Sequence, residues 1–222
     1  LLKIVNSAQY MLAKKVDSIS EAVKLVGMRG IKNLLFSYGT QKILGGDTGE
    51  KKALWEHSYK AAFYAFNLVK NYKKDHNLLD DAYVGGILHD MGKIIFASVH
   101  PELLDKIKVF CTDKGMPPST FEDLTAGMNH AEIGSMVAEK WNFPEQLVHA
   151  IKFHHDPLSA APEERDLIYT VYLANMLCLY ETGAVTLDQF DSQVLENFGI
   201  TSKKQIDVLI ERFSEGFKKE NL

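Results

Sequence analysis

The sequence predicts an all-α fold, built as a single helical domain with a small N-terminal helical lobe. Apolar residues recur at steps of three and four along nearly the whole chain, which is the period of an amphipathic helix. Alternating apolar and polar runs, the pattern of half-buried strands, are scarce. The chain has 222 residues, of which 46% are hydrophobic, so it is long and apolar enough to bury a sizeable core.

The first helices are expected before residue 46. Ser18-Ile19-Ser20-Glu21 has the pattern of a capping box, which predicts a helix from there to Val26. A second helical stretch covers residues 31–44 and ends at Gly45-Gly46. Because the chain starts with apolar, helix-like residues and has no initiator Met, we expect it to begin inside an element.

The middle of the chain predicts four more helices. They are a long helix over about 51–73, a helix that begins at Leu79 and carries His89 and Asp90, a helix opened by Pro101, and a helix over 120–141. The clearest break is the segment with Pro117 and Pro118, between helices that we expect to share a site. For that reason we do not expect a domain boundary there.

The C-terminal part predicts a helix over 144–155, stopped by Asp156-Pro157, and a strongly apolar central helix over 162–180. Two amphipathic helices follow, near 186–197 and 202–219. No Gly/Ser linker or internal repeat divides the chain. We therefore expect one domain, with a helical lobe at 1–45, a core that carries the site at 46–183 and C-terminal helices at 184–222.

Composition disfavours several classes of partner. The formal net charge of −4 argues against a nucleic-acid or anionic-membrane binder, which needs a basic face. A helix-turn-helix over residues 25–35 is a weaker alternative because the local charge is modest. No apolar run approaches the ~18 residues of a membrane span. Cys111 and Cys178 lie far apart among apolar neighbours, which predicts buried, reduced thiols and a cytoplasmic location.

The eight histidines carry the strongest chemical pattern. Three of them, His76, His100 and His149, are interpreted as ordinary surface or core residues. His89-Asp90 is different, because an imidazole and a carboxylate follow a small, apolar run. Burying that carboxylate is costly unless a cation compensates it. A divalent metal or Lys93, one helical turn away, could do so, and a simple Asp90–Lys93 salt bridge is the alternative.

Four further histidines have neighbours that favour a role as metal ligands. His154-His155 precedes the turn at the end of a helix, where two adjacent side chains can converge. His57 and His130 are each expected to head a helical segment with small neighbours. Neutral imidazole is a common ligand of zinc, iron, copper and nickel. A helical bundle whose histidines only cap and form hydrogen bonds remains an alternative.

The order of these residues resembles the HD superfamily of metal-dependent phosphohydrolases, and the string 86–93 resembles the core HD helix of that superfamily. The segments 2–8, 19–27 and 31–35 are similar to the HDOD family, the HD-related output domains of bacterial signalling proteins. This resemblance runs from Leu1 to about Tyr180.

The resemblance implies an HD-type helical domain whose central helices hold a metal. Residue by residue, it implies these metal ligands: His57, His89, Asp90, His130, His154, His155 and, at the closing position, Asn175. The closing residue of an HD hydrolase is Asp, so Asn175 departs from the pattern and removes one anionic ligand. The three later histidines match the extra ligands of dinuclear HD-GYP phosphodiesterases, but the Gly-Tyr-Pro loop of that group is missing after His155.

We therefore expect a bacterial signal-transduction output domain with an HD-type metal site, regulatory and of weak or no catalytic activity. The alternative is a metal-dependent phosphohydrolase or phosphodiesterase acting on a nucleotide or cyclic nucleotide, with Asp90 and Lys93 as its catalytic residues. The expected cofactor is one or two divalent transition-metal ions, iron or manganese first, with zinc, cobalt or nickel compatible. Expected partners are other signalling proteins and a phosphate-containing ligand, and neither nucleic acid nor membrane.

Overall fold

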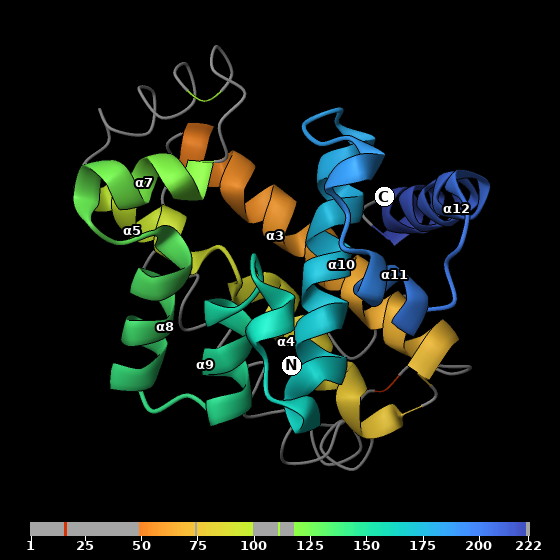
Figure 1. The fold of residues 1–222 in the computed structure, drawn as a ribbon, viewed down its shortest axis with the longest axis horizontal. Helices are drawn as coiled ribbons and strands as arrows, with labels where there is room; N and C mark the ends of the chain where they lie inside the picture. The colour runs from red at the N-terminus through yellow and green to blue at the C-terminus, as the bar shows by residue number, and fades with distance from the viewer. Residues whose placement is uncertain (1–15, 17–48, 74, 100–110, 112–117, 221–222) are drawn as a thin grey trace.

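The computed structural model describes residues 16, 49–73, 75–99, 111 and 118–220 (Figure 1). Within these residues every regular element is a helix, as the sequence predicts. The helices expected before residue 46, the alternative helix-turn-helix at 25–35 and the start of the helix at Pro101 lie outside the described residues. The helices are α3 (Gly49–Leu68), η2 (Val69–Lys73), η3 (His76–Leu78), α4 (Leu79–Leu88), α5 (Met91–Val99), α7 (Pro118–Ala126), α8 (His130–Lys140), α9 (Glu145–Lys152), η4 (Pro157–Ser159), η5 (Pro162–Glu164), α10 (Arg165–Glu181), η6 (Leu187–Gln189), α11 (Ser192–Asn197) and α12 (Lys203–Glu220).

Helix α10 runs through the centre of the bundle, as its apolar sequence predicts. Every residue from Leu167 to Cys178 is buried. Helices α3, α4 and α9 pack against α10 on different sides, and α12 lies across α3 and α10 at the C-terminal end (Figure 1). A helix that is apolar all round is stable only when neighbours cover it in this way.

Two glycines let the helices around the site come unusually close. A Cβ atom on Gly86 of α4 would lie 2.5 Å from Ala62 Cα of α3. A Cβ atom on Gly92 of α5 would lie 1.9 Å from the carbonyl oxygen of His130, at the start of α8. Glycine therefore permits the close approach of the helices that carry the candidate ligands.

The single helix predicted over 120–141 is wrong. Helix α7 ends at Ala126 and α8 begins at His130. Gly127 has φ +73°, a left-handed conformation that ends a helix. The side chain of Asn129 accepts a hydrogen bond from Glu132 N, and Glu132 completes the capping box of α8. Local turn chemistry thus overrides a helical period that continues through the break.

Other helix ends also differ from the prediction. His57 does not head a helix but lies inside α3, whereas His130 is the first residue of α8 as predicted. Helix α4 ends at Leu88, so His89 and Asp90 form a turn before α5. Helix α9 ends at Lys152, which places His154 and His155 just beyond it. The predicted position of this pair at a helix end is confirmed.

The two cysteines and the lengths of the helices bear on what the composition predicts. Cys111 and Cys178 are both buried and free, as predicted. Burial raises the pKa of both thiols, which keeps them protonated and unreactive. Among the described helices, none is both long enough and apolar enough to cross a bilayer.

Candidate metal centre

The predicted ligands come from separate elements and meet around Asp90. Two groups of side chains each bring their ligand atoms within 4.8 Å of one another. Asp90 belongs to both. We call Asp90, His130, His154 and His155 the first group. The second group is His57, His89 and Asp90.

The two oxygens of Asp90 face different groups. Asp90 Oδ1 lies 3.3 Å from His130 Nε2 and 3.5 Å from His154 Nε2. Asp90 Oδ2 lies 3.4 Å from His89 Nε2 and 3.7 Å from His57 Nε2. A carboxylate that directs one oxygen to each of two imidazole groups has the arrangement of a bridging ligand.

Hydrogen bonds at the far side of two rings fix which nitrogen carries the proton. His89 Nδ1 lies 2.7 Å from the carbonyl oxygen of Gly86, and His154 Nδ1 lies 2.7 Å from that of Ile151. Because a carbonyl oxygen can only accept, Nδ1 donates in both rings, and in the neutral imidazole Nε2 then keeps a free lone pair. Both lone pairs are directed to the side of Asp90.

Some buried polar atoms at the centre of the cluster lack a hydrogen-bond partner among the described residues. Within the described residues, His89 Nε2 and Asp90 Oδ1 have no hydrogen-bond partner although both are inaccessible to solvent. His130 Nε2 lies 3.3 Å from His154 Nε2, so two nitrogen atoms face each other. Ligand nitrogens bound ~2.1 Å from one metal ion lie roughly 3.0–3.4 Å apart. A cation in each of the two groups would satisfy these atoms.

Burial shifts the pKa of two imidazoles of the site, and neighbouring charges shift that of Asp90. Burial lowers the pKa of His57 to about 4 and that of His154 to about 3. Burial acts to raise the pKa of Asp90, but the neighbouring His89 and Lys93 outweigh it and hold this pKa well below its usual range. Neutral imidazoles and an ionised carboxylate are the forms that bind metal ions.

Lys93 and Asn175 lie at the edges of the cluster. Lys93 Nζ donates to Asp90 Oδ2 at 2.9 Å, so the salt bridge considered as an alternative exists within the same cluster. The side chains of His57 and Lys93 are 22% and 20% exposed, and His155 is exposed. This side of the cluster is therefore partly exposed to solvent. Asn175, buried in α10, accepts a hydrogen bond at Oδ1 from His57 Nε2 at 3.0 Å.

Sequence reasoning missed Glu122. This buried side chain of α7 accepts hydrogen bonds from both Nδ1 and the backbone N of His130. A single Glu eight residues before a His has no periodic or motif signature, so nothing in the sequence marks it. His149, interpreted as an ordinary residue, lies outside both groups and donates from Nδ1 to Glu164 at 2.7 Å.

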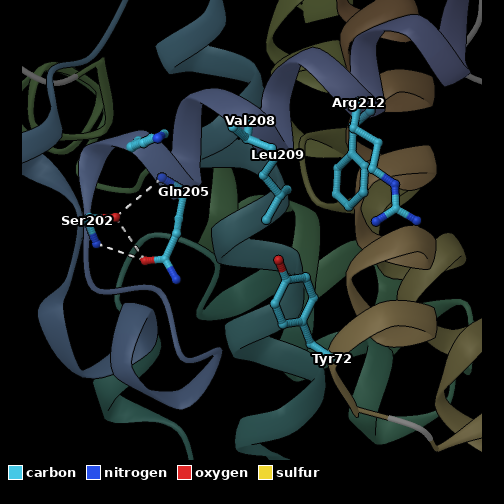
Figure 2. A pocket seen from close by; sticks show the side chains of 8 residues that line it. Tyr72, Ser202, Gln205, Val208, Leu209 and Arg212 are labelled. Atoms are coloured by element: carbon cyan, nitrogen blue, oxygen red, sulfur yellow. Dashed lines mark hydrogen bonds between the residues drawn. The ribbon is translucent and has the colours of Figure 1, made fainter.

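A separate pocket lies between η2 and α12 (Figure 2). Its lining contains neither an imidazole nor a carboxylate, so it offers no comparable set of metal ligands. Ser202 and Gln205 are hydrogen-bonded to each other there, as the dashed lines of Figure 2 show. Arg212 donates to Asn71 Oδ1 at 3.0 Å. The candidate metal centre is therefore the cluster around Asp90.

A protein-family model and a related protein both match this chain. The model of the HDOD domain matches residues 1–157. An uncharacterized protein of Treponema pallidum (strain Nichols) is 38% identical over 221 residues, which cover 99% of this chain and 43% of that protein. The chain therefore spans less than half the length of this relative.

Solved structures share the fold at low sequence identity. An HDOD domain protein from Geobacter sulfurreducens has a TM-score of 0.73 at 18% identity, over 98% of this chain and 77% of that chain. A candidate signal transduction protein from Marinobacter aquaeolei VT8 has a TM-score of 0.70 at 20% identity, over 99% and 51%. A candidate phosphohydrolase from Shewanella amazonensis SB2B has a TM-score of 0.63 at 22% identity, over 94% and 76%.

Proposed function

This chain belongs to the HDOD domain family, and from that premise we propose that it is a bacterial, cytoplasmic signal-transduction output domain that holds two divalent metal ions. One observation carries the proposal: two groups of ligand atoms share a single buried carboxylate, Asp90. Its turnover of phosphate esters is weak or absent, and its partners are other signalling proteins.

The donor chemistry fits a pair of transition-metal ions. The sites combine carboxylate oxygen with several imidazole nitrogens, a mixture that iron, manganese, zinc, cobalt and nickel accept. Iron and manganese are our first choice. The unpartnered His89 Nε2 and Asp90 Oδ1 are buried atoms that such an ion would satisfy. His130, His154 and His155 would hold one ion with Asp90, and the second group would hold the other.

Asn175 is the reason for expecting weak turnover. Asn175 supplies a neutral amide oxygen where an HD hydrolase has a carboxylate, so the second group has only its shared negative charge. The hydrogen bond from His57 Nε2 to Asn175 Oδ1 also competes with a metal ion for that nitrogen. We therefore expect the second ion to be held more weakly than the first.

A phosphohydrolase acting on a nucleotide or another phosphate-containing substrate is the second candidate function. Metal ions bound here would lower the pKa of a bound water and polarise a phosphate ester. Asp90 would hold both ions, and Lys93, partly exposed beside Asp90 Oδ2, would neutralise a phosphate oxygen. The edge formed by Lys93 and His57 favours this candidate because it is partly exposed to solvent.

The substitution Asn175→Asp tests the role of this position. We expect it to raise metal occupancy of the manganese- or iron-loaded protein, and with it any hydrolysis of a phosphodiester such as bis-(p-nitrophenyl) phosphate. Asn67→Asp is the matched control, because it adds the same charge on α3, ten residues beyond His57. Unchanged metal content and unchanged hydrolysis in Asn175→Asp would show that Asn175 is not a ligand. Rapid hydrolysis by the unaltered chain would instead support the phosphohydrolase.

A further inference from the structure

We infer that Glu122 is a positioning residue that fixes the His130 imidazole for the first metal ion, an inference that rests on the proposed metal centre. Glu122 Oε2 lies 2.6 Å from His130 Nδ1 and 2.8 Å from His130 N. Glu122 is 1% exposed and His130 is fully buried. One carboxylate oxygen thus accepts two N–H groups of the same residue, which fixes both the start of α8 and the orientation of the ring.

The other imidazoles of the cluster show that a charge is not required to fix a ring. His89 and His154 direct Nε2 toward Asp90 by donating from Nδ1 to neutral backbone carbonyl oxygens. Only His130 uses a buried carboxylate among the ligand rings whose Nδ1 partner is described. Burying an anion is costly unless something positive compensates it. A cation on the opposite side of the ring would balance the negative charge that Glu122 places beside His130.

A carboxylate behind an imidazole changes what the imidazole can do. The charge of Glu122 makes His130 Nε2 a stronger electron-pair donor and opposes the positive charge of a bound ion. It adds a second anion to the first group, whose only other anion is the shared Asp90. In the second group, His57 donates instead from Nε2 to the neutral Asn175. Glu122 thus favours filling of the first group before the second.

The break between α7 and α8 holds Glu122 in position. Asn129 caps α8 through Glu132 N and also donates from Nδ2 to Asp123 Oδ1 at 3.2 Å. Asp123 is the neighbour of Glu122 on α7, so the same residue that starts α8 also contacts α7. The position of the carboxylate is therefore coupled to the position of His130.

Glu122→Gln is the central variant, because it keeps the side-chain size and an acceptor oxygen while removing the charge. We expect it to weaken binding of one of the two ions by roughly 10–100-fold, the usual range for such partners, and to leave the other ion unchanged. Titration of the full chain with Co²⁺, followed by visible absorption, measures both steps. Glu164→Gln is the matched control, since Glu164 accepts from His149 Nδ1 at a similar 2.7 Å but lies outside the cluster.

A second variant and a second readout keep the test independent of folding. Glu122→Asp keeps the charge and should bind Co²⁺ more tightly than Glu122→Gln; the reverse order would contradict a role for charge. In the metal-free protein, the proton NMR signal of His130 Nδ1–H should lie far downfield and move upfield in Glu122→Gln.

The outcomes separate this inference from the proposed function. If the unaltered chain binds Co²⁺ and a folded Glu122→Gln variant binds it equally well at both steps, the inference is wrong and the metal centre stands. If the unaltered chain binds no metal, the proposed function is wrong. In that case the Nδ1–H signal decides whether Glu122 positions the ring, and an unchanged signal in Glu122→Gln overturns that as well.

Discussion

At the scale of single residues, Asp90 is the charged ligand that both groups share. Its Oδ2 accepts from Lys93, whereas its buried Oδ1 has no donor among the described residues and faces two imidazoles. A buried carboxylate oxygen without a donor is costly unless a cation compensates it. This observation is the local reason to place a metal ion in the first group, on the Oδ1 side of Asp90.

Asp90→Ala should abolish binding of both ions, because the residue belongs to both groups. Elemental analysis of the purified variant after loading with manganese or iron measures the loss. Asp81→Ala is the matched control, since Asp81 is a buried carboxylate that accepts from Gln146 outside the cluster. Full metal content in Asp90→Ala would remove the premise of the proposed centre.

At the scale of elements, close helix contacts bring the ligands together. His57, the His89–Asp90 turn and His130 lie on α3, between α4 and α5, and on α8. Gly86 and Gly92 sit where a side chain would strike the backbone of α3 or α8. The spacing of the two ligand groups thus depends on two positions that carry no functional group.

Gly92→Ala should destabilise the fold by at least ~2 kcal/mol, because the new Cβ would meet a backbone carbonyl that cannot rotate away. Gly49→Ala is the control, since no described residue lies within 4 Å of its Cβ position, and its effect should stay below ~1 kcal/mol. Urea unfolding of the metal-free variants gives both values. Equal stabilities would mean that α5 and α8 do not pack as closely as described.

The elements were more predictable from sequence than their contacts. The apolar period of α10 and the helix end before His154 could be predicted because both are local properties of the chain. The break at 127–129 was missed because the helical period continues across a left-handed glycine and a capping Asn129. Glu122 could not be found, because its contact with His130 depends on how α7 folds back on α8.

At the scale of the whole molecule, Glu181 of α10 joins its own helix to α3 and α12. Glu181 of α10 lies 2.8 Å from Lys60 Nζ and accepts from Tyr64 OH, both on α3. Ser214 of α12 donates to its other oxygen at 2.9 Å. The relative position of α3 and α10, which carry His57 and Asn175, is therefore supported by the C-terminal helix.

Stability of the metal-free protein should fall with decreasing pH below about 6.5. In the folded state the pKa is about 4 for His57 and about 3 for His154, against 6.5 for an unperturbed imidazole. The unfolded chain therefore binds protons in this window that the folded chain does not, and each ring costs about 1.4 kcal/mol per pH unit. Urea unfolding between pH 7.5 and 4.5 measures the slope, and His154→Gln should reduce it. A flat profile would contradict the burial of neutral imidazoles.

The most direct test of the metal centre is the metal content of the chain, measured by elemental analysis on protein purified without added metal or chelator. We predict more than one but fewer than two equivalents of a divalent transition metal per chain, because two groups of ligands share Asp90 and the second group holds its ion more weakly. No metal, even after loading with iron or manganese, would contradict the account and leave a helical scaffold whose histidines bind nothing.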